Sequence, residues 1–183
     1  MGKEQISAPT GALKPGLILG LFFILALFVG YFADAKLLIN QTFSAVVLLG
    51  LIVGAVVMAL QFRKSNGGYL SYGGSYSFHF IALAIGGALG ILFTILLFEV
   101  IDPELQSYLG DILLNNIVER LENRGQTSAN ITSRYESLKE FAYNQLTTVT
   151  FLKRYIFLLI VFAIVSSLVA LIAKKSKPEA EVS

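Results

Sequence analysis

The sequence predicts an all-α membrane protein with four transmembrane helices and an extramembrane amphipathic helical hairpin between spans three and four. Three observations predict this class: hydrophobic residues make up 55% of the 183 residues, charged residues make up only 14%, and the apolar residues gather in long blocks. A bilayer core about 30 Å thick requires roughly 20 apolar residues in a helix that rises about 1.5 Å per residue. Four blocks approach or exceed that length, at residues 16–33, 43–62, 78–98 and 151–173.

Each block is interpreted as a helix because backbone amides in hydrocarbon must find hydrogen-bond partners within their own segment. Residues 1–15, before the first block, are polar and lack apolar periodicity, which predicts a flexible cytoplasmic N-terminus. The first block is followed by "ADAK" at residues 33–36, so it also resembles a signal peptide with a small-residue cleavage site. Its apolar run is longer than the usual signal-peptide core of roughly 7–15 residues, and we therefore expect an uncleaved span.

The segment between the second and third blocks reads "NGGYLSYGGSYSFHF", at residues 66–80. It lacks the glycine spacing of a Walker loop or a dinucleotide-binding fingerprint. Residues 66–68 instead permit a tight turn with positive φ, and Tyr69 and Tyr72 are amphipathic rings suited to the membrane–water boundary. Ser71 or Ser75 is expected to cap the third span. The segment therefore predicts an interfacial turn, whose tyrosines are candidate interfacial or partner-binding residues.

The predicted outer segment covers residues 102–150 and begins with helix signals. Asp102 is expected to cap a helix, Pro103 suits its first position, and Gly125 suits its end. Apolar residues recur at helical spacing on one face: Leu105, Leu109, Ile112, Leu113, Ile117 and Leu121. A second apolar pattern, expected to run into the fourth span, follows: Ile131, Tyr135, Leu138, Ala142 and Leu146. The two patterns predict a helical hairpin whose apolar stripes either cover each other or lie on the headgroup surface.

Charge predicts how the chain is oriented in the membrane. With four spans both termini share one side, and most basic residues near the membrane fall there: Lys3, Lys14, Arg63, Lys64, Lys174, Lys175 and Lys177. The other side holds only Lys36, Lys153 and Arg154 close to the spans. The positive-inside rule then predicts cytoplasmic termini, including a tail at residues 174–183, and a periplasmic hairpin. The hairpin carries seven acidic and four basic residues, a balance that disfavours nucleic acid as a partner.

Small residues four positions apart predict close helix packing inside the membrane. The pairs are Gly16 with Gly20, Gly50 with Gly54, and Gly86 with Gly90. Such small-xxx-small faces let helix backbones approach closely, which increases dispersion contacts where the hydrophobic effect gives no drive between helices. Two interpretations stay open: packing within the monomer, or a homodimer formed through one of these faces.

The middle of every span lacks acids, bases and histidine, and the polar candidates lie at the span ends. His79 is interpreted either as a proton switch or ligand, or as an interfacial histidine facing headgroups. Glu99 and Asp102 are three residues apart, so they can share a helix face and bind a cation, or anchor a helix end. The chain has one histidine, no cysteine and no HExxH or GxSxG motif, so we expect no enzyme, no catalytic or metal site and no cofactor.

Four features together resemble a known family. They are "NGGYLSYGGSYSF" leading into a span, a span ending in "FEVIDPEL", the pair of outer helices, and a last span closing with "AKKSK". In this order they resemble the bacterial family of small four-span membrane proteins described as a domain of unknown function, DUF4199, over residues 14–177. The resemblance implies a bacterial inner-membrane location and the four-span layout, and it implies no activity, cofactor or catalytic residue. The chain has Gly73 and Gly74 where one glycine is expected before the third span.

Two functional hypotheses follow from the sequence. The first is a structural or accessory membrane protein that binds a membrane-protein partner or a second copy through helix packing and apolar hairpin residues such as Leu109 and Ile112. The second is a carrier or channel for a small solute or lipid, which requires a cavity between the spans.

Overall fold

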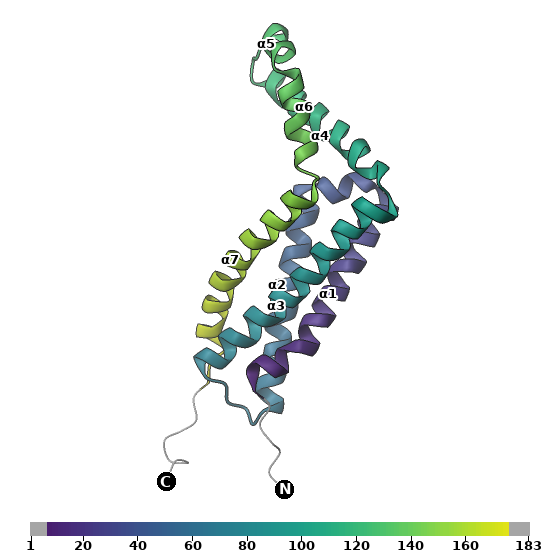
Figure 1. Ribbon diagram of the computed structural model, residues 1–183. Coiled ribbons are helices and arrows are strands. Elements are labelled where there is room, and N and C mark those ends of the chain that lie inside the picture. The colour runs from purple at the N-terminus through teal and green to yellow at the C-terminus, as the bar shows by residue number, and fades with distance from the viewer. Residues whose placement is uncertain (1–6, 176–183) are drawn as a thin grey trace, which may run out of the picture.

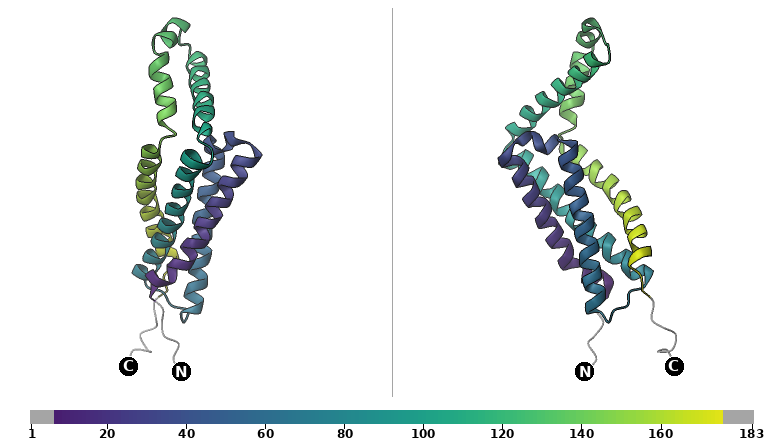
Figure 2. Two further views of the ribbon diagram at one scale, coloured as in Figure 1. Left: turned by 45° about the vertical axis from the view of Figure 1, so that its right-hand side comes forward. Right: turned by 180° about the vertical axis from the view of Figure 1, so that it is seen from behind.

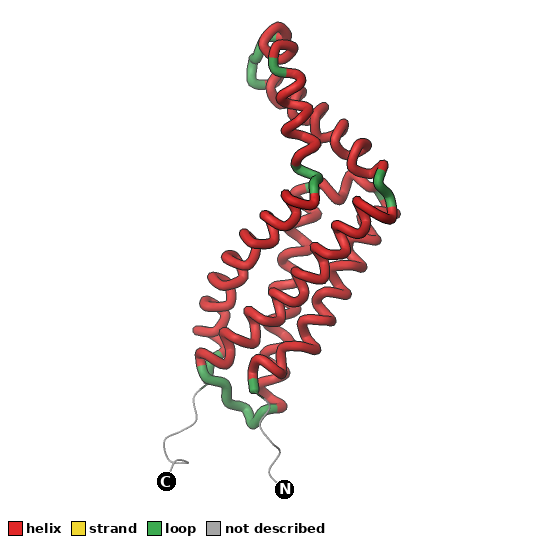
Figure 3. Tube along the Cα trace, viewed as in Figure 1, coloured by secondary structure: helices red, strands yellow, loops and turns green. Residues whose placement is uncertain are grey.

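The computed structural model describes residues 7–175, and the regular elements of these residues are helices joined by short turns (Figure 3). The four long helices are α1 (Ala8–Ala33), α2 (Gln41–Ser65), α3 (Tyr72–Leu96) and α7 (Thr148–Ala173). A short 3-10 helix, η1 (Ala35–Ile39), joins α1 to α2, and a π-helical turn, η2 (Leu97–Ile101), continues α3. The helices between α3 and α7 are α4 (Glu104–Asn123), α5 (Ser128–Ser133) and α6 (Tyr135–Asn144).

Four of these helices are long and apolar enough to cross a membrane: α1, α2, α3 together with η2, and α7. They coincide with the four predicted blocks, so the helical class and the number of candidate spans are confirmed. Helix α1 begins eight residues earlier than the predicted first span, at a start capped by Ser7, whose Oγ accepts a hydrogen bond from the Thr10 amide. Residues 8–15, predicted as part of a flexible terminus, are therefore helical, while residues 1–6 lie outside the described residues.

Helix α3 lies at the centre of the bundle, between α1 and α7 (Figure 1). It packs most extensively on α1 and next on α7, while α2 packs on both α1 and α3 and has only a small contact with α7. Two further views show the same four-helix body with η1 across one end (Figure 2). Helix α1 starts and α7 finishes at the opposite end.

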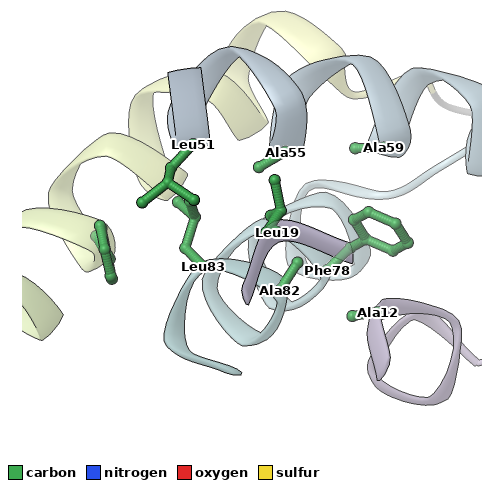
Figure 4. Close-up of a cluster of buried hydrophobic side chains, with 9 residues drawn as sticks. Ala12, Leu19, Leu51, Ala55, Ala59, Phe78, Ala82 and Leu83 are labelled. Atoms are coloured by element: carbon green, nitrogen blue, oxygen red, sulfur yellow. The ribbon is translucent and has the colours of Figure 1, made fainter. Parts of the chain in front are cut away.

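The main core lies where α2 crosses α1, α3 and α7 (Figure 4). Small and large side chains alternate in it: Ala12, Leu19, Leu51, Ala55, Ala59, Phe78, Ala82, Leu83 and Phe162. Ala55 and Ala59 of α2 are at most 1% exposed, and their small side chains let α2 approach Leu19 and Phe78 closely. The Phe78 ring stacks on Phe62, with ring centroids 4.8 Å apart.

The predicted glycine pairs lie at helix–helix contacts within the chain. Gly16 and Gly20 of α1 meet the face of α3 that carries Gly86 and Gly90. A Cβ atom added to Gly86 would lie 2.8 Å from the Leu19 Cβ and 3.3 Å from the Gly20 amide nitrogen, so the two backbones are in near contact. On α2, a Cβ at Gly50 or Gly54 would meet the side chains of α1 residues 22 and 19, respectively. These faces therefore already have neighbours inside the monomer.

The turn between α2 and α3 follows its prediction. Gly67 and Gly68 have φ values of 89° and 83°, a left-handed conformation that favours glycine. Ser71 caps α3, its Oγ accepting a hydrogen bond from the Gly74 amide at 3.1 Å. The glycine pair at 73 and 74 therefore belongs to the first turn of α3, and the helix begins six residues before the predicted span. Leu70 also forms a small antiparallel bridge with Lys175, which joins this turn to the end of α7.

Helices α4, α5 and α6 form a hairpin that extends beyond the end of the bundle where η1 lies (Figure 1). Asp102 Oδ1 accepts a hydrogen bond from the Leu105 amide at 3.2 Å, and Gly125 has a φ of 79° just after α4, as predicted. Pro103, predicted at the first helical position, instead directly precedes α4, which begins at Glu104. The second arm of the hairpin differs from its prediction, because helix α6 ends at Asn144 instead of running into α7, which begins at Thr148. Thr147 caps the start of α7 after this break, its Oγ1 accepting a hydrogen bond from the Thr150 amide.

A second core cluster joins the base of the hairpin to the bundle. It contains Ile91, Leu97, Phe98, Leu105, Leu109, Leu146 and Phe151, with Ile112 and Leu113 packed against it. Farther along, α4 packs on α6, where Gly110 lies under the ring of Tyr143 and the Tyr143 hydroxyl donates to Asp111 Oδ1 at 2.6 Å. The apolar stripe of α4 is thus covered by the bundle at one end and by α6 at the other.

Candidate functional site

A cavity of about 390 Å³ lies between the four long helices, in the half of the bundle next to the hairpin. It is lined by the first turns of α2, from Gln41 to Leu51, and by α7 from Phe151 to Phe162, with α1 and α3 behind them. Thirteen of its 17 lining residues are apolar. We call this space the α2–α7 cleft. Its volume lies within the range of about 300–1,000 Å³ that is usual for ligand sites.

Helices α2 and α7 are joined by a hydrogen bond at the end of the bundle away from the cleft. At the end of the bundle away from the hairpin, Arg63 Nη1 donates a hydrogen bond to the Ala173 carbonyl oxygen at 2.7 Å. This contact places a cation at the C-terminus of α7, where the helix dipole favours it. Near the hairpin, the small residues Ala26 and Ala45 line the cleft and leave space that larger side chains would occupy.

Polar groups gather at the hairpin end of the cleft. Arg154, in the second turn of α7, donates from Nη2 to the side-chain oxygen of Gln145 at 2.8 Å. Thr94 donates to the Gly90 carbonyl oxygen of its own helix at 2.9 Å, and Ser44 likewise donates to Asn40 at 3.0 Å. Among the described residues that line the cleft, Arg154 is the only one with a positive charge.

The charge of Arg154 is not neutralised by a carboxylate of residues 7–175, since Gln145 is the only hydrogen-bond partner of its guanidinium there. Arg154 lies six residues after Thr148, which places it about 9 Å along a helix that rises about 1.5 Å per residue. Arg154 is exposed at the rim of the cleft, and a cation at such a position in an apolar helix usually faces a polar partner or a ligand. Its remaining N–H donors are free to bind an anionic group.

A smaller cavity of about 200 Å³ continues the cleft under the hairpin. The two cavities share lining residues, among them Leu38, Thr94 and Arg154. Leu113 of α4 and Leu146, which follows α6, close the smaller cavity from the hairpin side. The combined site therefore has a long apolar part between the helices and a polar part beneath the hairpin. This arrangement suits an amphiphile with an apolar chain and an anionic head.

The two predicted acidic candidates have separate structural roles. Glu99 Oε1 accepts a hydrogen bond from Thr148 Oγ1 at 2.6 Å, which joins the end of α3 to the start of α7. Asp102 accepts from the Tyr31 hydroxyl at 3.0 Å and from the Leu105 amide, and so joins α1 to α4. Neither acid forms an ion pair with a basic residue in the described part of the chain. Both anchor helix ends, one of the two interpretations that the sequence left open.

His79 lies inside the bundle, because its ring is 1% exposed. Its Nδ1 donates to the Ser75 carbonyl oxygen at 2.7 Å, and its Nε2 has no partner among the described residues. The interpretation of His79 as an interfacial residue facing headgroups is therefore wrong: it lies on the same face of α3 as the buried Ala82 and Gly86.

The other predicted interfacial and partner-binding residues also contact their own chain. The Lys175 ammonium lies 5.7 Å from the centre of the Tyr69 ring, and the Tyr72 hydroxyl is 2.8 Å from Ser167 Oγ. Leu109 is fully buried in the second core cluster, and Ile112 packs against that cluster. Substituting Leu109 or Ile112 would therefore disturb the fold of this chain as well as any partner contact.

Arg154 was predicted only as a charge at the entrance of the fourth block, and Ser44, Thr94 and Gln145 were not predicted as site residues. The position of Arg154 in the sequence could have marked it as a candidate site residue. It lies about one and a half turns inside an apolar helix, and no acidic residue stands three or four positions away to pair with it. The structure also has no group of three or more histidine, cysteine, aspartate or glutamate residues that could hold a metal ion, as far as residues 7–175 are concerned.

Comparison with known proteins places the chain in a family. Neither curated proteins nor solved structures give a match. A family model described as "Protein of unknown function (DUF4199)" matches residues 14–175, nearly the range over which the sequence features resemble it. Because this match covers most of the chain, including most of α1, the other three long helices and the hairpin, the protein belongs to the DUF4199 family.

Proposed function

We propose that the protein binds an anionic phospholipid in the α2–α7 cleft and that it is a lipid-binding membrane protein rather than an enzyme. The observation that carries this proposal is Arg154, a cation at the polar end of an apolar cleft that has only the neutral Gln145 as a partner within the described chain. A lipid phosphate accepts charge-assisted hydrogen bonds from the planar guanidinium, which is suited to bidentate contact with phosphate.

The selectivity of such a site would come from its polar end. A lipid chain that leaves the bilayer for the cleft stays in an apolar environment, so its transfer gains little hydrophobic free energy. The apolar lining therefore selects by shape and dispersion contacts, while Arg154 selects by charge. A hydrogen bond to a charged group contributes about 1.5–3 kcal/mol, and the phosphate of a zwitterionic lipid can accept it as well. The preference for an anionic lipid therefore comes from the net negative charge of its head, because the ammonium group of a zwitterionic head offsets part of the attraction between its phosphate and Arg154.

The direct test is lipid binding by the full chain in nanodiscs that contain equal amounts of anionic and zwitterionic phospholipids. Native mass spectrometry of the released protein should find anionic lipid retained preferentially. Arg154→Gln should reduce that preference. Lys153→Gln is the matched control, since it removes the same charge from the neighbouring residue, which does not line the cleft. Equal retention by wild type and R154Q, or equal loss in both variants, would refute the proposal.

A second variant tests the apolar part of the site. Ala26 and Ala45 line the cleft, so Ala26→Phe should fill space that a lipid chain requires and reduce lipid retention. Leu49→Phe is its control, because Leu49 is 61% exposed on α2 and does not line the cleft. Lipid retention that is unchanged by A26F in a folded protein would contradict occupation of the cleft by a chain.

We further propose that the protein lies in the bacterial inner membrane with both termini cytoplasmic and the hairpin periplasmic. This proposal is supported by the family membership and by the excess of basic residues near the ends of the spans opposite the hairpin. The chain has no cysteine, so a single cysteine can report its side. In intact cells, Glu122→Cys on the hairpin should react with an impermeant maleimide, and Ser65→Cys should react only after lysis. The reverse pattern would contradict this orientation.

An accessory role is the second candidate, supported by a different observation. The hairpin extends beyond the bundle and leaves Tyr135 and Phe141 of α6 exposed by 44% and 57%. Exposed aromatic side chains are typical anchors of protein interfaces. A membrane-protein partner would therefore be lost from a mild-detergent purification by Phe141→Ser and retained by the R154Q variant. Retention of the same partner by F141S would exclude this surface.

A further inference from the structure

A separate and largely open surface groove with a volume of about 530 Å³ lies at the hairpin end of α1, between α1, η1 and the start of α4. Its walls include three aromatic rings, those of Tyr31, Phe32 and Tyr108. The Tyr31 and Phe32 rings meet edge to face with centroids 5.1 Å apart, and Tyr108 is 49% exposed. We call this space the aromatic pocket. It is distinct from the α2–α7 cleft, with which it shares no lining residue.

Two carboxylates complete the aromatic pocket. Asp102 is held in place by the Tyr31 hydroxyl at Oδ2 and by the Leu105 amide at Oδ1. The Glu104 side chain has no hydrogen bond or ion pair with any residue of the described part of the chain. A carboxylate has about four lone-pair sites, so Asp102 can still accept from a ligand. The aromatic pocket therefore combines three aromatic side chains with two carboxylates that form no ion pair with a described lysine or arginine.

The geometry points to an organic ammonium ion as the ligand of the aromatic pocket. Ring faces attract cations, and aromatic walls contact the N-alkyl groups that a bare metal ion lacks. The carboxylates supply the opposite charge, and no third acidic, histidine or cysteine ligand stands near enough to form a metal site in residues 7–175. Tyr31 and Phe32 lie in the last turn of α1, at the end of a candidate span, where lipid headgroups would reach them. The ammonium group belongs either to a free amine or to a zwitterionic lipid head.

The test uses the full chain in an uncharged detergent, titrated calorimetrically with choline chloride and, separately, with sodium chloride. Choline should bind at least tenfold more tightly than sodium. Tyr108→Leu should weaken choline binding at least fivefold, Tyr108→Phe should retain it because the ring face is kept, and Glu104→Gln should also weaken it at least fivefold. Tyr135→Leu and Glu136→Gln are matched controls on an exposed part of the hairpin outside the pocket, and both should bind choline as the wild type does.

A second arm identifies the source of the ammonium group. Native mass spectrometry from nanodiscs of choline phospholipid, with wild type and Y108L compared, shows whether a lipid head occupies the pocket. Choline binding that depends on Tyr108 supports a free ion, and Tyr108-dependent lipid retention supports a headgroup. Absence of both, or sodium binding as tight as choline binding, would overturn the assignment. The outcome is independent of the α2–α7 cleft, because neither Arg154 nor an anionic lipid enters this test.

Discussion

The contact between α1 and α3 gives the sharpest test of how the bundle is packed. We predict that Gly86→Ala destabilises the protein, because the added methyl group would lie 2.8 Å from the Leu19 Cβ and 3.3 Å from the Gly20 amide nitrogen. Both atoms belong to or adjoin the backbone of α1, so they move only if the helix moves. Gly73→Ala is the matched control, since a Cβ there has nothing within 4 Å.

The magnitude follows from comparing these two substitutions. Each replaces glycine by alanine in α3, so the difference in helix propensity between the two residue types largely cancels. Inserting a methyl group into a tightly packed contact costs about 1–3 kcal/mol, and a chain of this size shifts its Tm by about 2–4 °C per kcal/mol. Gly86→Ala should therefore melt roughly 2–12 °C below Gly73→Ala in the same detergent, as followed by circular dichroism. Equal melting temperatures would refute close backbone packing at this site.

Two further predictions concern the hairpin and its junction with the bundle. The hydrogen bond from Tyr143 to the Asp111 carboxylate, together with partial desolvation, raises the pKa of Tyr143 above its ordinary value. Because the pKa of Tyr143 is raised in the folded protein, this hydrogen bond contributes its full stability to the fold at pH values below the unfolded pKa of about 10. That contribution is lost as the pH rises through the folded pKa. Asp111→Asn should shift one tyrosine to lower pKa in a spectrophotometric titration, and superimposable titrations would contradict it. Glu99→Ala removes the acceptor of the Thr148 hydroxyl at the start of α7, so proteolysis between α6 and α7 should become faster, whereas an unchanged rate would exclude Glu99 as an anchor.

The four long helices could be predicted because hydrocarbon imposes a length and an apolarity that the sequence displays directly. The N-terminal extension of α1 was missed because residues 8–15 are mixed in polarity. Ser7 and Pro9 nevertheless fit a helix start, and Ala12 packs in the core with no exposure. The burial of His79 was also accessible in principle, since Ser75, His79 and Ala82 recur at helical spacing on the face that carries the glycines.

The α2–α7 cleft could not be predicted from the sequence. Its volume depends on how α2 and α7 sit relative to each other, and no periodicity of either helix encodes that distance. The pairing of Arg154 with Gln145 likewise depends on the break between α6 and α7, where the apolar pattern had predicted a continuous helix. The aromatic pocket has the same origin, since Tyr31 and Tyr108 are brought together by the packing of α4 near the end of α1.

Occupation of the α2–α7 cleft by a lipid chain can be measured most directly by fluorescence quenching. The chain has no tryptophan, so Phe43→Trp places a single reporter in the cleft lining, and Phe157→Trp places one on the 66% exposed side of α7. With acyl-brominated lipids in nanodiscs, F43W should be quenched more strongly by the anionic than by the zwitterionic lipid, and R154Q should abolish this difference. F157W should be quenched equally by both lipids. Quenching of F43W that does not depend on lipid charge or on Arg154 would contradict a charge-selective lipid site in the cleft.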